Sequence, residues 1–347
     1  MEFDLSLWAW TAVFAISASV VVAAGIVLAQ AGDAIATRTG LGGLFVGMLL
    51  MAAATSLPEV VTDVSAALAG APDLAVGDLF GSSMANMAIL AIIDLAYGRR
   101  VWPTIGLGHA RLAAVAIGLT AFVLMAIVSP VRLQIGWIGL ESLAVVAAYV
   151  VAAWWMRHPT GAPSAAQPRL AAAREDLLTP TGWGARASAL PVRVHLLRFA
   201  AAAGVILISA PFVAQSAKGI AEETGIAQTF VGVTLLALAT SLPELVASIA
   251  AVRIGAHDLA VGNLFGSNAF NMTIVLFVDA AYVEGPVLAA VSPLQLLPGL
   301  GAVVLMAIAL GAIVQGTTTR LRRGEPDAVL LLLAYVGLLL LAWNAAA

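Results

Sequence analysis

Long apolar stretches, separated by short polar segments, run along almost the whole chain. Stretches of about 20 apolar residues are long enough for a helix to cross a bilayer, whereas strands of a membrane barrel would alternate apolar and polar residues. The pattern therefore predicts an all-α integral membrane protein with ten transmembrane helices. The ten predicted spans cover residues 7–29, 43–69, 73–97, 110–130, 134–156, 193–216, 228–252, 258–282, 287–315 and 328–346.

The chain repeats itself at an offset of 185 residues. Between Phe45–Tyr97 and Phe230–Tyr282, 30 of the 53 aligned positions are identical without a gap. Each copy lies in a set of five predicted helices, and because five is odd, the second copy must enter the membrane in the opposite orientation. We expect two inverted five-helix repeats, and such repeats are typical of secondary transporters with a binding site near the middle of the membrane.

These repeats divide the chain into three parts. Residues 1–156 form the first five-helix repeat and residues 193–347 the second, and each contains one copy of the duplicated segment. Residues 157–192 are too short and too poor in apolar side chains for a folded domain, so we interpret them as a flexible cytoplasmic linker.

The basic residues indicate the orientation of the chain. Cytoplasmic loops of membrane proteins accumulate Lys and Arg. If the N-terminus lies outside, 14 of the 16 basic residues fall in cytoplasmic loops or at the cytoplasmic ends of spans, and only Arg132 and Lys218 lie outside. This predicts that both termini are outside and that the protein resides in the plasma (inner) membrane.

The composition excludes several classes of function. The chain is 62% hydrophobic and only 10% charged, far from the balance of a soluble domain, so membrane lipid is its expected surrounding. It has no cysteine, which excludes disulfides and thiolate chemistry. No GxxxxGK[ST] loop indicates a nucleotide site, and no nucleophile–base arrangement indicates an enzyme. Nothing points to nucleic acid, to a cofactor or to an obligate protein partner.

A proline and a glutamate interrupt the second predicted span, in the sequence ATSLPEVVTD that begins at Ala54. Pro58 has no backbone N–H and its ring clashes with the carbonyl of Ala54, so the helix should break around Thr55–Ser56 and leave carbonyl oxygens unpaired. Such backbone, and the carboxylate of Glu59 beside it, are tolerated at membrane depth only in a cavity or inside protein. The second copy, ATSLPELVAS from Ala239, repeats the arrangement with Pro243, Glu244 and a predicted break at Thr240–Ser241.

The next predicted span of each repeat adds polar side chains four residues apart, which places them on one helical face. They are Ser82 and Asn86 in GDLFGSSMAN, and Ser267 and Asn271 in GNLFGSNAFN. Together with the carboxylates and loose carbonyls they form an all-oxygen site, which suits hard cations such as Na⁺ and Ca²⁺. Two carboxylates neutralise one Ca²⁺, and Na⁺ would compete for the same ligands.

Two aspartates occur only in the first repeat. Asp63 lies one helical turn after Glu59, and Asp78 stands in the GD of the next span. Asp63 is interpreted as a third acidic ligand, as a site that stays protonated because burial removes it from water, or as a satisfied polar group that faces the outer cavity. Near the far ends of their helices, Asp94 and Asp279 are expected to anchor the chain at the membrane interface.

The paired TSLPE and GS(S/N)xxN segments resemble the α-repeats of the sodium/calcium exchanger family, within the calcium/cation antiporter superfamily. The resemblance implies ten helices and alternating access, with the first and sixth spans as sliding gates. It also implies main-chain carbonyl contacts to Na⁺ at Ala52 and Ala237. Carried over by position, the ion ligands are Thr55, Ser56, Glu59, Ser82, Asn86, Thr240, Ser241, Glu244, Ser267 and Asn271, with Asp63 and Asp78 as further candidates.

We therefore expect a secondary active antiporter that exchanges Na⁺ for Ca²⁺ across the membrane, with both ions as transported substrates and no cofactor. An antiporter that couples H⁺ to Ca²⁺, or to another divalent cation, is the alternative. A cation channel with the same oxygen-lined site is less favoured, because a duplicated, inverted architecture is typical of carriers.

Overall fold

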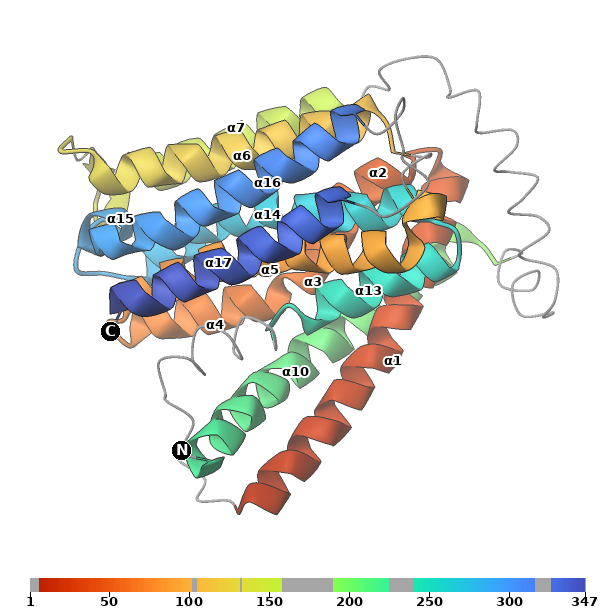
Figure 1. The fold of residues 1–347 in the computed structure, drawn as a ribbon, viewed down its shortest axis with the longest axis horizontal. Helices are drawn as coiled ribbons and strands as arrows, with labels where there is room; N and C mark the ends of the chain where they lie inside the picture. Colours follow the sequence, from red (N-terminus) through yellow and green to blue (C-terminus); the bar gives the residue numbers. More distant parts are fainter. Residues whose placement is uncertain are drawn as a thin grey trace.

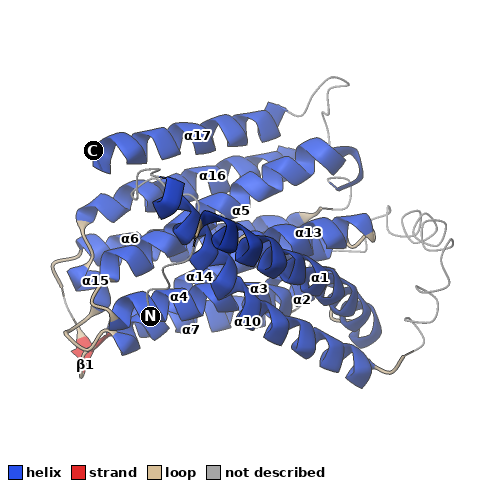
Figure 2. Ribbon diagram, turned by 90° about the horizontal axis from the view of Figure 1, so that it is seen from below, coloured by secondary structure: helices blue, strands red, loops and turns tan. Residues whose placement is uncertain are grey.

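The computed structural model describes residues 6–101, 105–131, 133–157, 190–224, 240–315 and 326–346, and these residues are almost entirely helical. A short antiparallel hairpin, β1 (Gln134–Ile135) and β2 (Ile138–Gly139), lies at one end of the bundle (Figure 2). The helices are α1 (Leu7–Thr39), α2 (Gly43–Val46), the π-helical η1 (Gly47–Met51), α3 (Ala52–Thr55), α4 (Leu57–Leu68), α5 (Pro72–Val101), α6 (Leu107–Val128), α7 (Leu140–Met156), α10 (Val192–Thr224), α13 (Leu242–Arg253), α14 (His257–Ala281), α15 (Val287–Ala290), the 3₁₀ turn η4 (Pro293–Gln295), α16 (Leu296–Gln315) and α17 (Pro326–Ala346).

Six of these helices are long and apolar enough to cross a membrane, and the bent pair α3–α4 with its preceding turns adds a seventh. Two further predicted spans appear as shorter apolar helices, α7 and α17. Of the predicted span 228–252, the structure describes only the part from residue 240 onward, and residues 158–189 of the predicted linker also lie outside the described ranges. The helical membrane class is confirmed, while the count of ten spans stays a prediction.

Helices α1 and α10 form a pair that slants away from the other helices (Figure 1). Where they meet, Val21, Ala210 and Val213 form a small apolar cluster separate from the main core. Helix α1 runs ten residues beyond the predicted end at residue 29 and stops where Gly40 adopts a left-handed conformation (φ 71°). Glycine reaches this conformation without steric cost, which makes it a common helix stop.

At the centre of the main bundle, α14 packs against η1, α4, α5, α6 and α7. Small residues allow backbones to approach closely at such contacts. A Cβ atom added to Gly266 would lie 2.6 Å from the Cα of Met48, and one added to Gly262 would lie 2.9 Å from the carbonyl oxygen of Leu44. The absence of side chains at these two positions therefore lets α14 lie directly against the bent segment.

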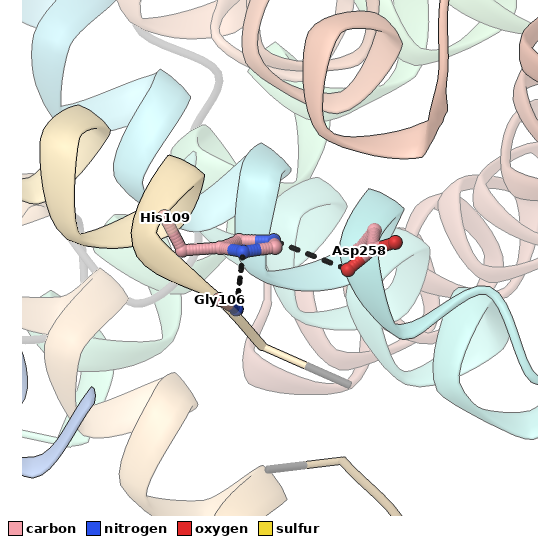
Figure 3. A network of polar contacts seen from close by, with 3 residues as sticks. All are labelled: Gly106, His109 and Asp258. Carbon is pink, nitrogen blue, oxygen red and sulfur yellow. Dashed lines mark hydrogen bonds and ion pairs between the residues drawn. The ribbon is translucent and has the colours of Figure 1, made fainter. Parts of the chain in front are cut away.

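Polar contacts fix α14 at both ends. Near its start, His109 on α6 lies 3.5 Å from the carboxylate of Asp258 and accepts a hydrogen bond from the backbone N–H of Gly106 (Figure 3). Near its end, the carboxylate of Asp279 is fully buried. It accepts three hydrogen bonds of 2.6–2.8 Å, from the backbone N–H groups of Gly139 and Val287 and the hydroxyl of Ser142.

The interfacial anchoring predicted for Asp94 and Asp279 is therefore wrong for Asp279. Strand β2 and the first turns of α7 and α15 supply the N–H and O–H donors, so the carboxylate is satisfied by protein rather than by the membrane interface. Asp94 is buried as well, with 3% of its surface exposed.

Candidate cation-binding site

The predicted helix break in the first repeat is confirmed. Helix α3 ends at Thr55, Ser56 adopts a non-helical conformation (φ −87°, ψ 6°), and α4 starts at Leu57 with Pro58 in its first turn. The axes on the two sides of the break differ by 45°. Proline explains the position of the break, because it cannot donate the next helical hydrogen bond but fits well in a first turn.

The second repeat has the same local conformation. Ser241 (φ −81°, ψ 5°) precedes α13, which begins at Leu242 with Pro243 in its first turn. The residues upstream, 225–239, lie outside the described ranges, so the predicted Ala237 contact and the first half of this span are not described. In each repeat a helix therefore begins inside the protein and carries a glutamate in its first turn.

Both glutamates are buried at helix N-termini. Glu59 on α4 is 1% exposed and Glu244 on α13 is 0% exposed. A helix N-terminus carries unpaired N–H groups and a partial positive charge, which stabilise a nearby carboxylate. This helps to explain how two acidic side chains are held inside an apolar bundle.

Around Glu244 the structure brings together predicted ligands from both repeats. Its Oε1 atom accepts hydrogen bonds from the hydroxyls of Ser56, at 3.1 Å, and Ser267, at 3.4 Å. The hydroxyl of Thr55 lies 3.5 Å from that of Ser267. The other carboxylate oxygen of Glu244 has no partner among the described residues. Thr240, in the turn before Glu244, is buried as well.

Around Glu59 the corresponding side chains are buried but not hydrogen-bonded to it. Ser241 and Ser82 are the repeat counterparts of Ser56 and Ser267. Within the described part of the chain, their hydroxyl oxygens and Oε2 of Glu59 have no hydrogen-bond partner. Burying polar atoms without a partner costs free energy, so a set of such atoms indicates a place where a polar ligand binds.

The two predicted amide ligands differ in their partners. Asn86 on α5 donates from Nδ2 to Oδ1 of Asn268 at 2.9 Å, and its own Oδ1 has no partner among described residues. Neither polar atom of Asn271 on α14 has one. Both side chains are at most 1% exposed. Amide oxygens are good ligands for hard cations, whereas amide N–H groups repel them.

The two additional aspartates are also buried and lie beside each other. Asp63 on α4 is 0% exposed and Asp78 on α5 is 8% exposed, and the two side chains are close enough to interact. Both oxygens of Asp63 lack a donor among the described residues. A cation bound beside this pair would offset the repulsion between two neighbouring carboxylates.

The counterparts of this pair, Ser248 and Asn263, also touch. Asn263 donates from Nδ2 to the hydroxyl of Ser248 at 3.1 Å and accepts at Oδ1 from Thr55 at 3.3 Å. Sequence reasoning missed Asn263 as a neighbour of the site. The signal was present, because the aligned repeats differ at this position, where Asp78 stands in the first copy.

The chemistry of this arrangement is that of oxygen coordination. Throughout the described ranges, no three Asp, Glu, His or Cys side chains converge in a metal-binding geometry. A cation held by the two glutamates must therefore take its remaining ligands from hydroxyls, amides and main-chain carbonyls. Such mixed, neutral-rich oxygen sites suit Na⁺ and Ca²⁺ better than transition metals, which favour nitrogen and sulfur ligands.

Comparison with known proteins identifies the family of the chain. The family model described as sodium/calcium exchanger protein matches residues 9–157 and 194–344. The putative antiporter CaxA of Alkalimonas amylolytica is 26% identical over 317 residues, which cover 88% of this chain and 89% of that protein. The inner membrane protein YrbG of Escherichia coli (strain K12) is 30% identical over 260 residues, 72% of each protein.

The fold is also similar to that of a solved exchanger. A structure of the sodium-calcium exchanger NCX_Mj superimposes with a TM-score of 0.67 and 19% sequence identity, covering 95% of this chain and 97% of that one. The family model covers both halves of the chain, including all the described site residues. The chain therefore belongs to the sodium/calcium exchanger family and is a multi-pass membrane transporter rather than an enzyme.

Proposed function

We propose that this cation/Ca²⁺ antiporter exchanges Na⁺ for Ca²⁺ by alternating access at a single site between the two repeats. The observation that carries the proposal is the set of buried oxygen atoms without protein partners around Glu59 and Glu244, to which both repeats contribute. In secondary transporters with inverted repeats, substrates bind where interrupted helices of the two repeats meet.

The two glutamates explain the preference for a divalent cation. Together they neutralise one Ca²⁺, which takes roughly 6–8 oxygen ligands. Four carboxylate oxygens and two threonine carbonyls would supply six. Several Na⁺ ions would divide the same oxygens among them, so the two loads exclude one another. The proposed ligands are Thr55, Ser56, Glu59, Ser82, Asn86, Thr240, Ser241, Glu244, Ser267 and Asn271, with the carbonyls of Ala52 and Ala237 for Na⁺ and with Asp63 and Asp78 as additional candidates.

The proposal includes the ten-helix architecture as two inverted repeats, with residues 1–156 and 193–347 joined by a linker at 157–192. Helices α1 and α10 would act as the gates. Their extensive contact with each other and their slant away from the other helices support this role, since the two helices can then move together as a pair (Figure 1). Gly25 on α1 lies against α13, where an added Cβ would be 2.8 Å from Cγ1 of Val246.

The proposed orientation, with both termini outside the plasma (inner) membrane, has a direct test. The chain has no cysteine, so single cysteines introduced at either terminus or in the linker are unambiguous labels. A membrane-impermeant maleimide applied to intact cells should modify the terminal cysteines and spare the one in the linker. The reverse pattern would invert the proposed topology.

One observation favours a second candidate, H⁺/Ca²⁺ exchange. The Asp63–Asp78 pair provides two buried acidic groups near Glu59, and such groups can carry a proton. If that position released a proton whenever Ca²⁺ arrived, the proton gradient would drive transport. The Asp63–Asp78 pair occurs in one repeat only, whereas the two glutamates occur in both.

Purified protein in liposomes separates the two candidates. With Na⁺ inside and radioactive calcium outside, we expect uptake that stops when the Na⁺ gradient is removed and that persists when a protonophore collapses the pH gradient. Liposomes loaded with K⁺ instead of Na⁺ are the control. Uptake that follows the pH gradient and ignores Na⁺ would replace the first proposal with H⁺/Ca²⁺ exchange. Large unitary currents without a counter-ion would indicate a channel.

A further inference from the structure

Asn268 on α14 makes an asymmetric bridge to α5. Its Nδ2 donates to the carbonyl oxygen of Ser83 at 3.2 Å, and its Oδ1 accepts from Nδ2 of Asn86 at 2.9 Å. Ser83 and Asn86 are three residues apart and therefore share a face of α5. The side chain of Asn268 is fully buried, with 0% of its surface exposed, so this bridge lies in the dry interior.

The bridge determines which end of the Asn86 amide is available. Because Nδ2 of Asn86 is engaged with Asn268, Oδ1 on the other branch of the planar amide points away from Asn268. That oxygen is buried and has no partner among the described residues. A cation binds the oxygen of an amide and is repelled by the NH₂ group, so the orientation decides whether Asn86 is a ligand at all.

The second repeat has no equivalent bridge. The repeat counterpart of Asn268 is Ser83, and that of Asn86 is Asn271. The hydroxyl of Ser83 donates at 2.8 Å to the carbonyl of Leu79 on its own helix. Both polar atoms of Asn271 lack a partner in the described part of the chain. No hydrogen bond among the described residues holds Asn271 in one orientation.

We propose that Asn268 is a positioning residue for cation binding, which holds the amide of Asn86 with its oxygen toward the site. The proposal rests on the proposed function in that Asn86 is taken to be an ion ligand. Residues that orient a metal ligand from behind typically contribute a factor of 10–100 to metal affinity. Asn86 is thus a preset ligand, whereas Asn271 turns its oxygen inward only when a cation attracts it.

The test compares Asn268→Ser with Ser83→Ala. Asn268→Ser gives the second repeat the residue of the first, removes the acceptor for Asn86 and leaves Asn86 itself intact. Ser83→Ala changes the matched position but removes a hydroxyl bonded only to its own helix. Calcium affinity is measured by titration calorimetry on purified protein in nanodiscs. We expect Asn268→Ser to bind Ca²⁺ roughly 10- to 100-fold more weakly and Ser83→Ala to stay within about twofold of wild type.

A double variant separates positioning from a general structural role. If Asn268 acts through Asn86, then Asn268→Ser causes no further loss in an Asn86→Ala background, since there is no longer an amide to orient. Losses that multiply in the double variant, or an Asn268→Ser protein with wild-type affinity, would overturn the proposal. Thermal unfolding without Ca²⁺ shows whether the fold itself is weakened.

The same titrations keep this proposal distinct from the proposed function. Wild-type Ca²⁺ binding is repeated in increasing NaCl, with choline chloride as the ionic-strength control. Competition by Na⁺ supports shared ligands. If Na⁺ does not compete, Na⁺ coupling fails, yet the affinity of Asn268→Ser for Ca²⁺ still decides whether Asn268 positions Asn86.

Discussion

The two repeats share most of their sequence but differ in the polar pairs beside the site. In the second repeat, Ser248 and Asn263 form a neutral pair that is joined by a hydrogen bond of 3.1 Å and reaches Thr55. In the first repeat the same two positions hold Asp63 and Asp78, whose carboxyl groups face each other without a donor among the described residues. The same helical scaffold therefore places an acidic pair beside the site in one repeat and a neutral pair in the other.

This difference separates positions of the duplicated core that serve packing from positions whose charge varies between the repeats. In the serine–asparagine pair the two side chains are hydrogen-bonded to each other. The pair therefore stabilises the contact between α13 and α14 and does not need a bound cation. Two buried carboxyl groups cannot satisfy each other unless a proton or a cation lies between them. The first repeat therefore carries more acidic side chains near the proposed site than the second.

The largest effect is expected from removing a charge that both repeats share. Glu59→Gln and Glu244→Gln each keep the size of the side chain but remove half of the negative charge that neutralises Ca²⁺. We expect each variant to lose more than about 100-fold in calcium uptake, and to lose Na⁺ binding with it, because both ions use the same oxygens. Uptake of radioactive calcium and Na⁺ titration measure the two losses.

The exposed Glu284 provides the matched control, since its carboxylate is accessible to solvent and accepts a hydrogen bond from Tyr282. Glu284→Gln should transport normally. A Glu244→Gln variant that loses Ca²⁺ binding but keeps Na⁺ binding would contradict shared ligands, and it would separate the two repeats into sites for different ions.

A second prediction concerns the close approach between α14 and the bent segment. In Gly266→Ala the new Cβ would lie 2.6 Å from the Cα of Met48 and 2.7 Å from its carbonyl oxygen, and these backbone atoms cannot rotate away. Overpacking of this kind costs about 1–3 kcal/mol or more. We expect a lower unfolding temperature in detergent and little transport. Gly118→Ala is the control, because no atom lies within 4 Å of its added Cβ.

Whether a feature of this site could be predicted from the sequence depends on how far apart in the chain the interacting residues lie. The break at Thr55–Ser56 was predictable because it follows from the missing N–H of Pro58 a few residues away. That the serines and glutamates share one site followed from the repeat. The crossed partnership, in which Ser56 of one repeat donates to Glu244 of the other, depends on how the helices pack. No local pattern specifies that packing.

The same limit applies to the residues that sequence reasoning missed. Asn263 and Asn268 differ between the aligned repeats, so their asymmetry was visible. Their contacts with Thr55 and Asn86 were not, because each joins positions about 180 or more residues apart. Asp279 was misplaced for a related reason: its three donors come from segments that only the folded chain brings to the end of α14.

The third prediction makes the first repeat resemble the second. The double substitution Asp63→Ser with Asp78→Asn introduces the Ser248–Asn263 pair at the matched positions and should form the corresponding hydrogen bond. Loss of nearby negative charge should weaken Ca²⁺ affinity by roughly tenfold, which is about 1.4 kcal/mol, while the fold is retained. Titration calorimetry measures the change. Unchanged affinity and unchanged pH dependence of uptake would assign the aspartates no part in ion binding.

The smallest effect on transport is expected from Asp279→Asn, and it sharpens the contrast between two kinds of buried aspartate. Asp279 already accepts three hydrogen bonds from protein, so most of its acceptor capacity serves protein donors rather than a transported ion. An asparagine places an NH₂ group against donors, and losing such a bond costs about 1–3 kcal/mol. The variant should therefore unfold at a lower temperature yet bind Ca²⁺ with wild-type affinity, whereas the Asp63 and Asp78 substitutions should show the opposite pattern. If Asp279→Asn instead weakened Ca²⁺ binding at an unchanged unfolding temperature, the number of hydrogen bonds to a buried aspartate would not distinguish structural from ion-binding roles in this bundle.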